Sequence, residues 1–201
     1  AGWDLKALNA GEMQLDNWWE TDDYGDGGFT GLTENWQLNK PVIAAINGLA
    51  IGGGFEMAMG CDLLIAADHA EFGLPEMPLG IVPDAGALQR LPRLIPHNIA
   101  MEMFLLGRRM KAAEAAHYGL VNKVVPKQDL MTVAREWAAS IAWSAPLAMQ
   151  TVKEVQREIE CVPLQQAFHK MRSDPMPTYR KMLKSDAVSY THLRAHETRI
   201  H

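Results

Sequence analysis

Cysteine is scarce in this chain of 201 residues, in which only Cys61 and Cys161 occur, a hundred positions apart. Neither residue belongs to a Cys-x-x-Cys pair or to a cluster of cysteines and histidines. A cysteine-based metal site needs clustered ligands and a disulfide framework needs several cysteines, so neither is predicted. We therefore expect no metal ion, and we expect the reducing environment of the cytoplasm.

Long apolar runs and an excess of positive charge are also missing. No stretch of about eighteen apolar residues occurs, and the segment from Ala1 to Lys6 lacks the basic and apolar regions of a signal peptide. The net charge is −5, because 24 Asp and Glu outnumber 19 Lys and Arg. Nucleic acids and anionic membranes both favour clustered cations, so we expect neither as a partner. The hydrophobic content of 48% predicts an ordinary globular chain with a sizeable core.

Two nucleotide-binding motifs are absent despite a glycine run at Gly52–Gly54. Met57 occupies the last glycine position of a Gly-x-Gly-x-x-Gly fingerprint counted from Gly52, and no Gly-Lys-Ser/Thr follows. A glycine run before a helix still lets a ligand approach the backbone, and the helix start adds a partial positive charge. The run predicts a site for an anion or a developing oxyanion. Close packing of a helix on a strand is the alternative interpretation.

Apolar runs separated by turns predict an α/β fold. Residues 41–46 and 63–67 have the pattern of strands buried on both faces, and residues 55–59 read as the start of a helix between them. Strand, helix and strand within about thirty residues form a crossover unit with parallel strands. Later in the chain, residues 112–118 predict a helix that ends at Gly119.

The last third of the chain is predicted to be mainly helical. Residues 120–125 form a short strand in this interpretation, and two long helices follow. Asp129 is expected to cap the first of them, and Ser144 together with Pro146 is expected to start the second.

Two glutamates carry the strongest functional signal. Glu56 directly follows the glycine run, and Glu76 lies twenty residues later in Phe72-Gly73-Leu74-Pro75-Glu76. Burial in these apolar segments would raise the pKa of both carboxyl groups and produce an acid/base pair. Alternatively, Glu56 only interacts with the helix dipole and Glu76 is an ordinary loop residue. Asp84 is a third carboxylate, for which capping the following helix is the favoured role.

The remaining aromatic and histidine residues give weaker signals. Four tryptophans in the first part of the chain, Trp3, Trp18, Trp19 and Trp36, either line a ligand site or pack in the core. His97, His117 and His169 have no recognisable partner pattern, so no catalytic role is predicted for them.

Three segments together resemble a known family. They are Asn47-Gly48-Leu49-Ala50-Ile51-Gly52-Gly53-Gly54-Phe55-Glu56, Phe72-Gly73-Leu74-Pro75-Glu76 and Gly80-Ile81-Val82-Pro83-Asp84-Ala85-Gly86. They are similar to the crotonase superfamily, the enoyl-CoA hydratase/isomerase family, and the resemblance extends from Ala1 to about Ala187. It implies an α/β fold in which a spiral of ββα turns is followed by C-terminal helices. Within the family, Trp3, Pro83-Asp84 and residues 28–33 most resemble dehydratases of a short acyl chain that carries a trimethylammonium group.

The resemblance also implies domain boundaries. Residues 1–125 correspond to a partial spiral core and residues 126–187 to the helical region. The first strands of the family have no counterpart before Ala1, so the spiral is expected to be N-terminally truncated. Residues 188–201 do not resemble the family and are expected to lie outside the fold. We expect the 201-residue chain to be inactive, to aggregate or to bind CoA weakly, and the chain with the family's natural ends to be active.

Site residues follow from the resemblance position by position. The two oxyanion-hole N–H groups of the family fall on Trp3 and Gly53, and its two hydratase glutamates fall on Glu56 and Glu76. Leu5 and Lys6 are implied to lie beside CoA, although a surface lysine is an equal alternative for Lys6.

The implied activity is the addition or removal of water across the α,β double bond of an acyl-CoA thioester. No cofactor is implied beyond the coenzyme A of the substrate, and the full-length form is implied to be a homotrimer or a dimer of trimers. Two alternatives remain open. One is a double-bond isomerase that uses Asp84, and the other is an acyl-CoA-binding oligomer without activity.

Overall fold

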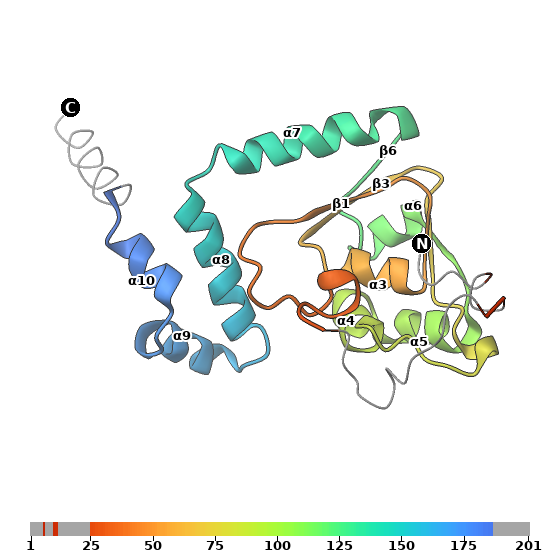
Figure 1. Cartoon of the computed structure of the whole chain (residues 1–201), viewed down its shortest axis with the longest axis horizontal. Coiled ribbons are helices and arrows are strands. Elements are labelled where there is room, and N and C mark those ends of the chain that lie inside the picture. Colours follow the sequence, from red (N-terminus) through yellow and green to blue (C-terminus); the bar gives the residue numbers. More distant parts are fainter. Residues whose placement is uncertain (1–5, 7–9, 12–24, 187–201) are drawn as a thin grey trace. The chain divides into compact units, whose positions relative to one another are not determined.

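Figure 1 shows the computed structural model of the chain, in which residue 6, residues 10–11 and residues 25–186 are described. The chain divides into two compact units. The first consists of residues up to Trp36 together with Val42–Glu136, and the second consists of Gln37–Pro41 and the residues from Trp137 onward.

Short strands of the first unit form two sheets of three strands each. Their bounds are β1 Ile43–Ile46, β2 Leu49–Ile51, β3 Leu63–Ala67, β4 Glu71–Gly73, β5 Met110–Lys111 and β6 Lys123–Val125. One sheet has the order β1-β3-β6 with parallel pairing throughout. The other has the order β2-β4-β5, in which β2 and β4 are parallel and β5 is antiparallel to β4.

The pairing of these strands produces a spiral. β1 and β2 follow each other in the chain but lie in different sheets, and each pairs with a strand one turn later. Ile43 is in register with Leu63, and Leu49 is in register with Glu71. The helix α3 (Gly53–Met59) completes the turn between them. This confirms the predicted crossover with parallel strands and the spiral of ββα turns.

Helices make up most of the remaining described chain. They are α4 Ala87–Leu94, α5 His97–Leu106, α6 Ala112–His117, α7 Leu130–Ala142, α8 Pro146–Ile159, α9 Leu164–Ser173 and α10 Pro177–Leu183, with short 3-10 turns η1 Phe29–Gly31, η2 Met77–Leu79 and η3 Lys127–Asp129. The predicted helices α6, α7 and α8 are confirmed. α9 and α10 lie in the region expected to be helical but were not predicted individually, although Pro163 is the N-cap of α9 and Pro177 is the first residue of α10, where proline is common.

Several predicted details are wrong. The strand predicted to be buried on both faces, β1, is only half-buried along its length, because it lies at the edge of its sheet while β3 occupies the centre. The strand predicted from residue 120 begins only at Lys123. Ala145, and not Ser144, is the N-cap of α8, and it makes no side-chain capping bond.

A core of apolar side chains holds the first unit together and positions the glutamates. Phe55 on α3 and Phe72 on β4 are both fully buried, and their ring centroids lie 5.2 Å apart at an interplanar angle of 52°. Burying one such side chain stabilises the fold by about 2–3 kcal/mol. Because Phe55 immediately precedes Glu56 and Phe72 lies four residues before Glu76, this contact fixes the backbone that carries both carboxylates.

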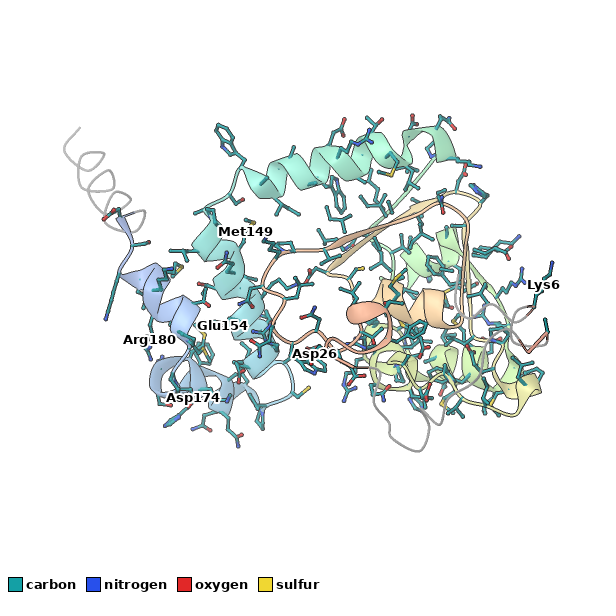
Figure 2. All side chains as sticks on the ribbon, viewed as in Figure 1. Lys6, Asp26, Met149, Glu154, Asp174 and Arg180 are labelled. Carbon is teal, nitrogen blue, oxygen red and sulfur yellow. The ribbon has the colours of Figure 1, made fainter. Side chains whose placement is uncertain are left out.

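In the second unit, a buried carboxylate ties two helices together. Glu154 lies on α8, where Figure 2 labels it, and only 6% of it is exposed. Its two oxygens accept hydrogen bonds from the backbone N–H groups of Thr178 (3.0 Å) and Tyr179 (2.8 Å) in the first turn of α10. Burial by itself raises the pKa of Glu154, but these bonds outweigh burial and hold the pKa below its ordinary value. The carboxylate therefore stabilises the start of α10.

We expect Glu154→Gln to lower the free energy of unfolding by about 2 kcal/mol at pH 7, because an amide accepts only one of the two N–H groups and turns a donor toward the other. A carboxyl whose pKa is lowered by folding contributes stability above its unfolded pKa of 4.5 and loses it as the pH falls further. Urea unfolding at pH 7 and pH 4 tests this. The exposed Glu160, changed to Gln, is the control, and an equal loss there would contradict the assignment.

Candidate active site

The glycine run lies where a strand ends and a helix begins. Gly52 has a φ of +55° and donates its N–H to the carbonyl oxygen of Gly73 at 2.9 Å, which is the last bond of the β2–β4 ladder. Gly53 is the first residue of α3. Its N–H is therefore past the ladder and belongs to the first turn of a helix, whose N–H groups have no acceptor within the helix. This geometry fits the predicted oxyanion donor at Gly53.

Side chains lie close to both glycines. A Cβ atom on Gly52 would lie 2.7 Å from Oε1 of Glu76, and a Cβ atom on Gly53 would lie 2.5 Å from Cε1 of Phe29. At either distance the neighbouring side chain would have to move if the glycine were replaced. A carboxylate and an aromatic ring thus lie against two consecutive glycines at the start of α3.

Glu56 is in the first turn of α3 and only 4% of it is exposed. Its Oε1 accepts a hydrogen bond of 3.0 Å from the N–H of Ala87, the first residue of α4. The carboxylate thus stabilises the N-terminus of a helix 31 residues later in the chain.

This arrangement corrects the role predicted for Asp84. The N-cap of α4 is Gly86 and not Asp84, and the N–H of Ala87 donates to Glu56. Asp84 nevertheless lies close enough to act electrostatically on both Glu56 and Glu76. The charge of Asp84 therefore contributes to raising the pKa of both predicted glutamates.

Glu76 is also buried, with 9% of it exposed. It precedes the 3-10 turn η2, and its Oε2 is buried without a hydrogen-bond partner among the residues that the structure describes. An unpaired buried oxygen of this kind costs free energy in the folded state. Such costs concentrate where a ligand or substrate is to be bound.

The environment shifts the acid/base properties of both glutamates in the same direction. Burial, opposed by the Ala87 N–H and reinforced by the charges of Glu76 and Asp84, raises the pKa of Glu56 to about 7. Burial is also the main reason why the pKa of Glu76 is raised, and the charge of Asp84 adds to it. Carboxyl groups with a pKa near neutrality are suited to donate and accept protons at physiological pH.

The raised pKa of Glu56 predicts a change in stability with pH. A carboxyl whose pKa is raised by folding stabilises the fold below its unfolded pKa, here 4.5, and this stability is lost as the pH rises through about 7. Glu56→Gln keeps an acceptor for Ala87 but carries no charge. We expect it to raise the free energy of unfolding at pH 8 by on the order of 2 kcal/mol, with little difference at pH 5. Urea unfolding at both pH values checks this, and a mutant that is equally destabilised at both would contradict it.

Several predicted residues cannot be compared with the structure. Trp3, Leu5, Trp18 and Trp19 lie outside the described residues, so the second oxyanion donor and part of the CoA site stay predictions. Lys6 is exposed, and its carbonyl oxygen accepts a hydrogen bond from the N–H of Ala10 at 2.9 Å.

Phe29 lies near the start of α3 and Arg90 contacts the same segment of the chain, and the sequence did not predict a role for either. Trp36 was predicted either to line a ligand site or to pack in the core. Trp36 is 57% exposed, with the guanidinium carbon of Arg90 lying 5.9 Å from its ring centroid. Arg90 also donates a hydrogen bond to the carbonyl oxygen of Thr33. Arg90 thereby holds the segment that carries Phe29 against the start of α3. The contacts join residues more than twenty positions apart, so no local pattern could have revealed Phe29 or Arg90.

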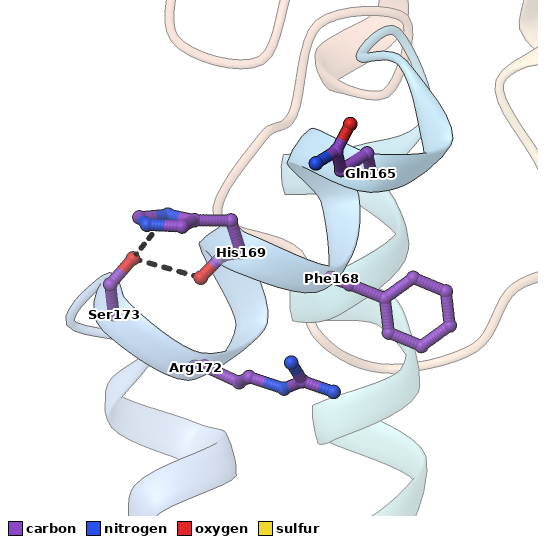
Figure 3. A pocket seen from close by; sticks show the side chains of 5 residues that line it. All are labelled: Gln165, Phe168, His169, Arg172 and Ser173. Atoms are coloured by element: carbon purple, nitrogen blue, oxygen red, sulfur yellow. Dashed lines mark hydrogen bonds between the residues drawn. The ribbon is translucent and has the colours of Figure 1, made fainter.

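A separate hollow of about 650 Å³ lies along α9 in the second unit (Figure 3). It is lined by Gln165, Phe168, His169, Arg172 and Ser173. Nδ1 of His169 and Oγ of Ser173 lie 3.0 Å apart, and this hydroxyl also donates to the carbonyl oxygen of His169. These hydrogen bonds are formed within a single helix. Glu56, Glu76 and Asp84 do not line this hollow.

Metal ligation and membrane insertion can be examined over the described part of the chain. No group of three or more His, Cys, Asp or Glu is arranged there to hold a metal ion. None of the helices described is both long enough and apolar enough to span a bilayer.

Comparison with known proteins agrees with this geometry. The pattern of the enoyl-CoA hydratase/isomerase family matches residues 1–181. Carnitinyl-CoA dehydratase of Citrobacter koseri is 48% identical over 186 residues, which are 92% of this chain and 69% of that protein.

Solved structures give the same result. An enoyl-CoA hydratase subunit I from Geobacillus kaustophilus superposes with a TM-score of 0.82 at 33% identity, covering 98% of this chain and 73% of that one. An enoyl-CoA hydratase/isomerase from Mycobacterium abscessus has a TM-score of 0.70 at 39% identity, covering 81% of this chain and 65% of that one. On the extent of the family match and these identities, the chain belongs to the enoyl-CoA hydratase/isomerase family.

Proposed function

We propose that this chain catalyses the reversible addition of water to the α,β double bond of an acyl-CoA thioester, as a hydratase or dehydratase. The observation that carries the proposal is the pair of buried glutamates, Glu56 and Glu76, with raised pKa values at the start of α3. Binding of CoA or packing of the helix would not require two buried carboxyl groups, whereas moving two protons does.

The oxyanion is stabilised by backbone donors in this proposal. When water adds at Cβ, negative charge develops on the thioester oxygen, and the Gly53 N–H together with the partial charge of the helix start stabilises it. The N–H of Trp3 is the second donor. Loss of one such donor typically lowers a rate by about 10²-fold or more.

The two glutamates divide the proton transfers. One takes a proton from the attacking water and the other delivers a proton to Cα, so that H and OH are added across the double bond. Because their charges interact, the pair titrates jointly, and neither is assigned alone as the base.

The substrate class follows from the relatives. The protein from Citrobacter koseri is named carnitinyl-CoA dehydratase, and an acyl chain with a trimethylammonium group is therefore the substrate proposed here. Leu5, Lys6 and the backbone near Trp3 are proposed to bind CoA. We further propose that the full-length protein forms a homotrimer or a dimer of trimers and that it is located in the cytoplasm.

A double-bond isomerase is the second candidate, because Asp84 acts electrostatically on both glutamates. It would move a proton between Cα and Cγ through Asp84 without adding water. A non-catalytic acyl-CoA-binding oligomer would do neither.

The test is to mix the protein with crotonyl-CoA and crotonobetainyl-CoA and to follow the absorbance of the enoyl thioester. Since the relatives are longer, the assay uses the 201-residue chain and the same chain joined to the N-terminal segment of a relative. Hydration removes the absorbance, and we expect this in the longer form. If that form instead generates the absorbance from a 3-enoyl thioester, it is an isomerase, and if it binds CoA without either change, the hydration proposal is wrong.

A further inference from the structure

We propose that Arg90 is a positioning residue for hydration, because its guanidinium group connects the start of α4, which binds Glu56, to residues 27–36. The inference rests on the proposed function and deepens it, since it identifies a residue that acts on the reaction through another. Two contacts of the guanidinium group carry it, one with Gly86 and one with the carbonyl oxygen of Thr33.

The start of α4 holds Glu56 in place. Oε1 of Glu56 accepts a hydrogen bond of 3.0 Å from the N–H of Ala87, and a backbone hydrogen bond from Ala85 also lowers the pKa of this carboxyl. Ala85 and Ala87 lie on either side of Gly86, the N-cap of α4, which has a φ of +123°. The position of Glu56 therefore depends on how the backbone around Gly86 is held.

The side chain of Arg90 packs on this glycine. The backbone N–H of Arg90 donates to the carbonyl oxygen of Gly86 at 2.9 Å in the first turn of α4. The side chain turns back, so that its Nη1 occupies the space that a Cβ atom on Gly86 would need. Glycine allows this close approach because it has no Cβ atom. The half-buried guanidinium group thus lies against the backbone between the two residues that bind Glu56.

Residues 27–36 hold the other terminal nitrogen of the guanidinium group. Nη2 donates to the carbonyl oxygen of Thr33, and Cζ lies 5.9 Å from the centroid of the Trp36 ring. Thr33 is fully buried, and the N–H of Glu34 donates to the carbonyl oxygen of Gly27 at 2.8 Å, so the acceptor belongs to a closed loop. A planar guanidinium group can bind a carbonyl and stack on a ring at the same time, whereas the compact ammonium group of lysine cannot.

The same loop also packs against the helix that carries Glu56. A Cβ atom on Gly60, the C-cap of α3, would lie 3.3 Å from the carbonyl oxygen of Leu32 and 3.5 Å from Cα of Thr33. Arg90 therefore joins α4 to a loop that already lies on α3. Without this connection the start of α4 can shift relative to α3, and a displacement of about 1 Å at a reacting group lowers a rate by about 10²-fold.

The first test measures kcat and KM for hydration of crotonyl-CoA, in the form joined to the N-terminal segment of a relative. We expect Arg90→Ala to lower kcat by about 10–10²-fold with little change in KM, and Arg90→Lys, which keeps the charge but not the planar fork, to lower it by about tenfold. Trp36→Leu should lower kcat only by about twofold to fivefold. Arg93→Ala is the matched control and should retain kcat, because this exposed arginine of the same helix also donates to a backbone carbonyl, that of Gln89.

The second test determines whether Arg90 acts through Glu56. If it does, Arg90→Ala/Glu56→Gln should be no slower than Glu56→Gln alone, because no acid is left to position. The pKa of the Glu56 carboxyl, followed by NMR and assigned by its absence from Glu56→Gln, should rise above about 7 in Arg90→Ala. The backbone hydrogen bonds around Gly86 lower this pKa, so weakening them raises it, while the charges of Glu76 and Asp84 are unchanged. Arg90→Lys gives the same comparisons if the alanine variant does not fold.

Additive losses in the double variant would overturn the inference, as would a Glu56 pKa that stays at about 7 or falls when Arg90 is replaced. A loss of kcat equal to the unfolded fraction, measured by circular dichroism, would also overturn it, because Arg90 would then only stabilise the fold. The titration separates this inference from the proposed function. If the unmodified protein hydrates no enoyl thioester, the proposed function fails, and the pKa still decides whether Arg90 places Glu56. If hydration occurs and Arg90→Ala retains kcat, only the inference fails.

Discussion

In the form joined to the N-terminal segment of a relative, Glu56→Gln and Glu76→Gln are each expected to lower kcat/KM for hydration of crotonyl-CoA by about 10²–10⁴-fold, the usual contribution of a general acid or base. Both side chains are buried, both have raised pKa values, and glutamine cannot accept or deliver the proton. Because glutamine retains the shape and an acceptor for the Ala87 N–H, the loss should appear mainly in kcat and not in the fold.

The pH dependence gives a second readout for the same variants. The unmodified enzyme should show a change in kcat/KM near pH 7, which belongs to the coupled pair. This change should be lost or displaced when either glutamate is replaced. The exposed Glu136 on α7, changed to Gln, controls for loss of a surface charge. Asp84→Asn should reduce the rate far less than either glutamate variant, and the reverse ranking would favour the isomerase.

The carboxylate pair was predictable because local context suffices to recognise it. A glycine run before an apolar helix and a glycine-proline segment before the second glutamate indicate burial without knowledge of the fold. The parallel pairing of β1 with β3 was predictable for the same reason, since both strands are continuous apolar runs. Strands β2, β4 and β5 have only two or three residues each, which is too short for a periodic pattern to appear.

Contacts across the fold explain the failures. Capping is usually assigned to a residue at the helix start, and Asp84 satisfies that local rule. In the structure the acceptor for Ala87 comes from Glu56, 31 residues earlier, because packing brings α3 and α4 together. Phe29 was not predicted for a related reason. It lies against Gly53, which is far from it in the sequence, and no local pattern indicates that the two segments meet. The acidic residues of the site could therefore be predicted from the sequence, but the residues that pack around them could not.

Gly52→Ala is expected to lower kcat by about 10²-fold, although no reacting group is changed. An alanine at φ +55° is strained, and its Cβ atom would lie 2.7 Å from Oε1 of Glu76, so the carboxylate has to move away from the start of α3. A displacement of about 1 Å is enough to cause a loss of this size.

Gly48→Ala is the matched control, because a Cβ atom there meets nothing within 4 Å and the backbone is not left-handed. It should retain nearly full activity.

The double variant Gly52→Ala/Glu76→Asp separates the two possible causes of the loss, which are backbone strain at position 52 and the contact of its Cβ atom with Glu76. The shorter aspartate does not reach the alanine, while the backbone strain persists. If backbone strain alone is responsible, kcat of Gly52→Ala should fall in proportion to its loss of unfolding free energy. Adding Glu76→Asp should then lower kcat further. If the contact itself is responsible, Glu76→Asp should cost less in the alanine background than in the unmodified protein. Full activity of Gly52→Ala would mean that the position of Glu76 beside the glycine run does not matter for the reaction.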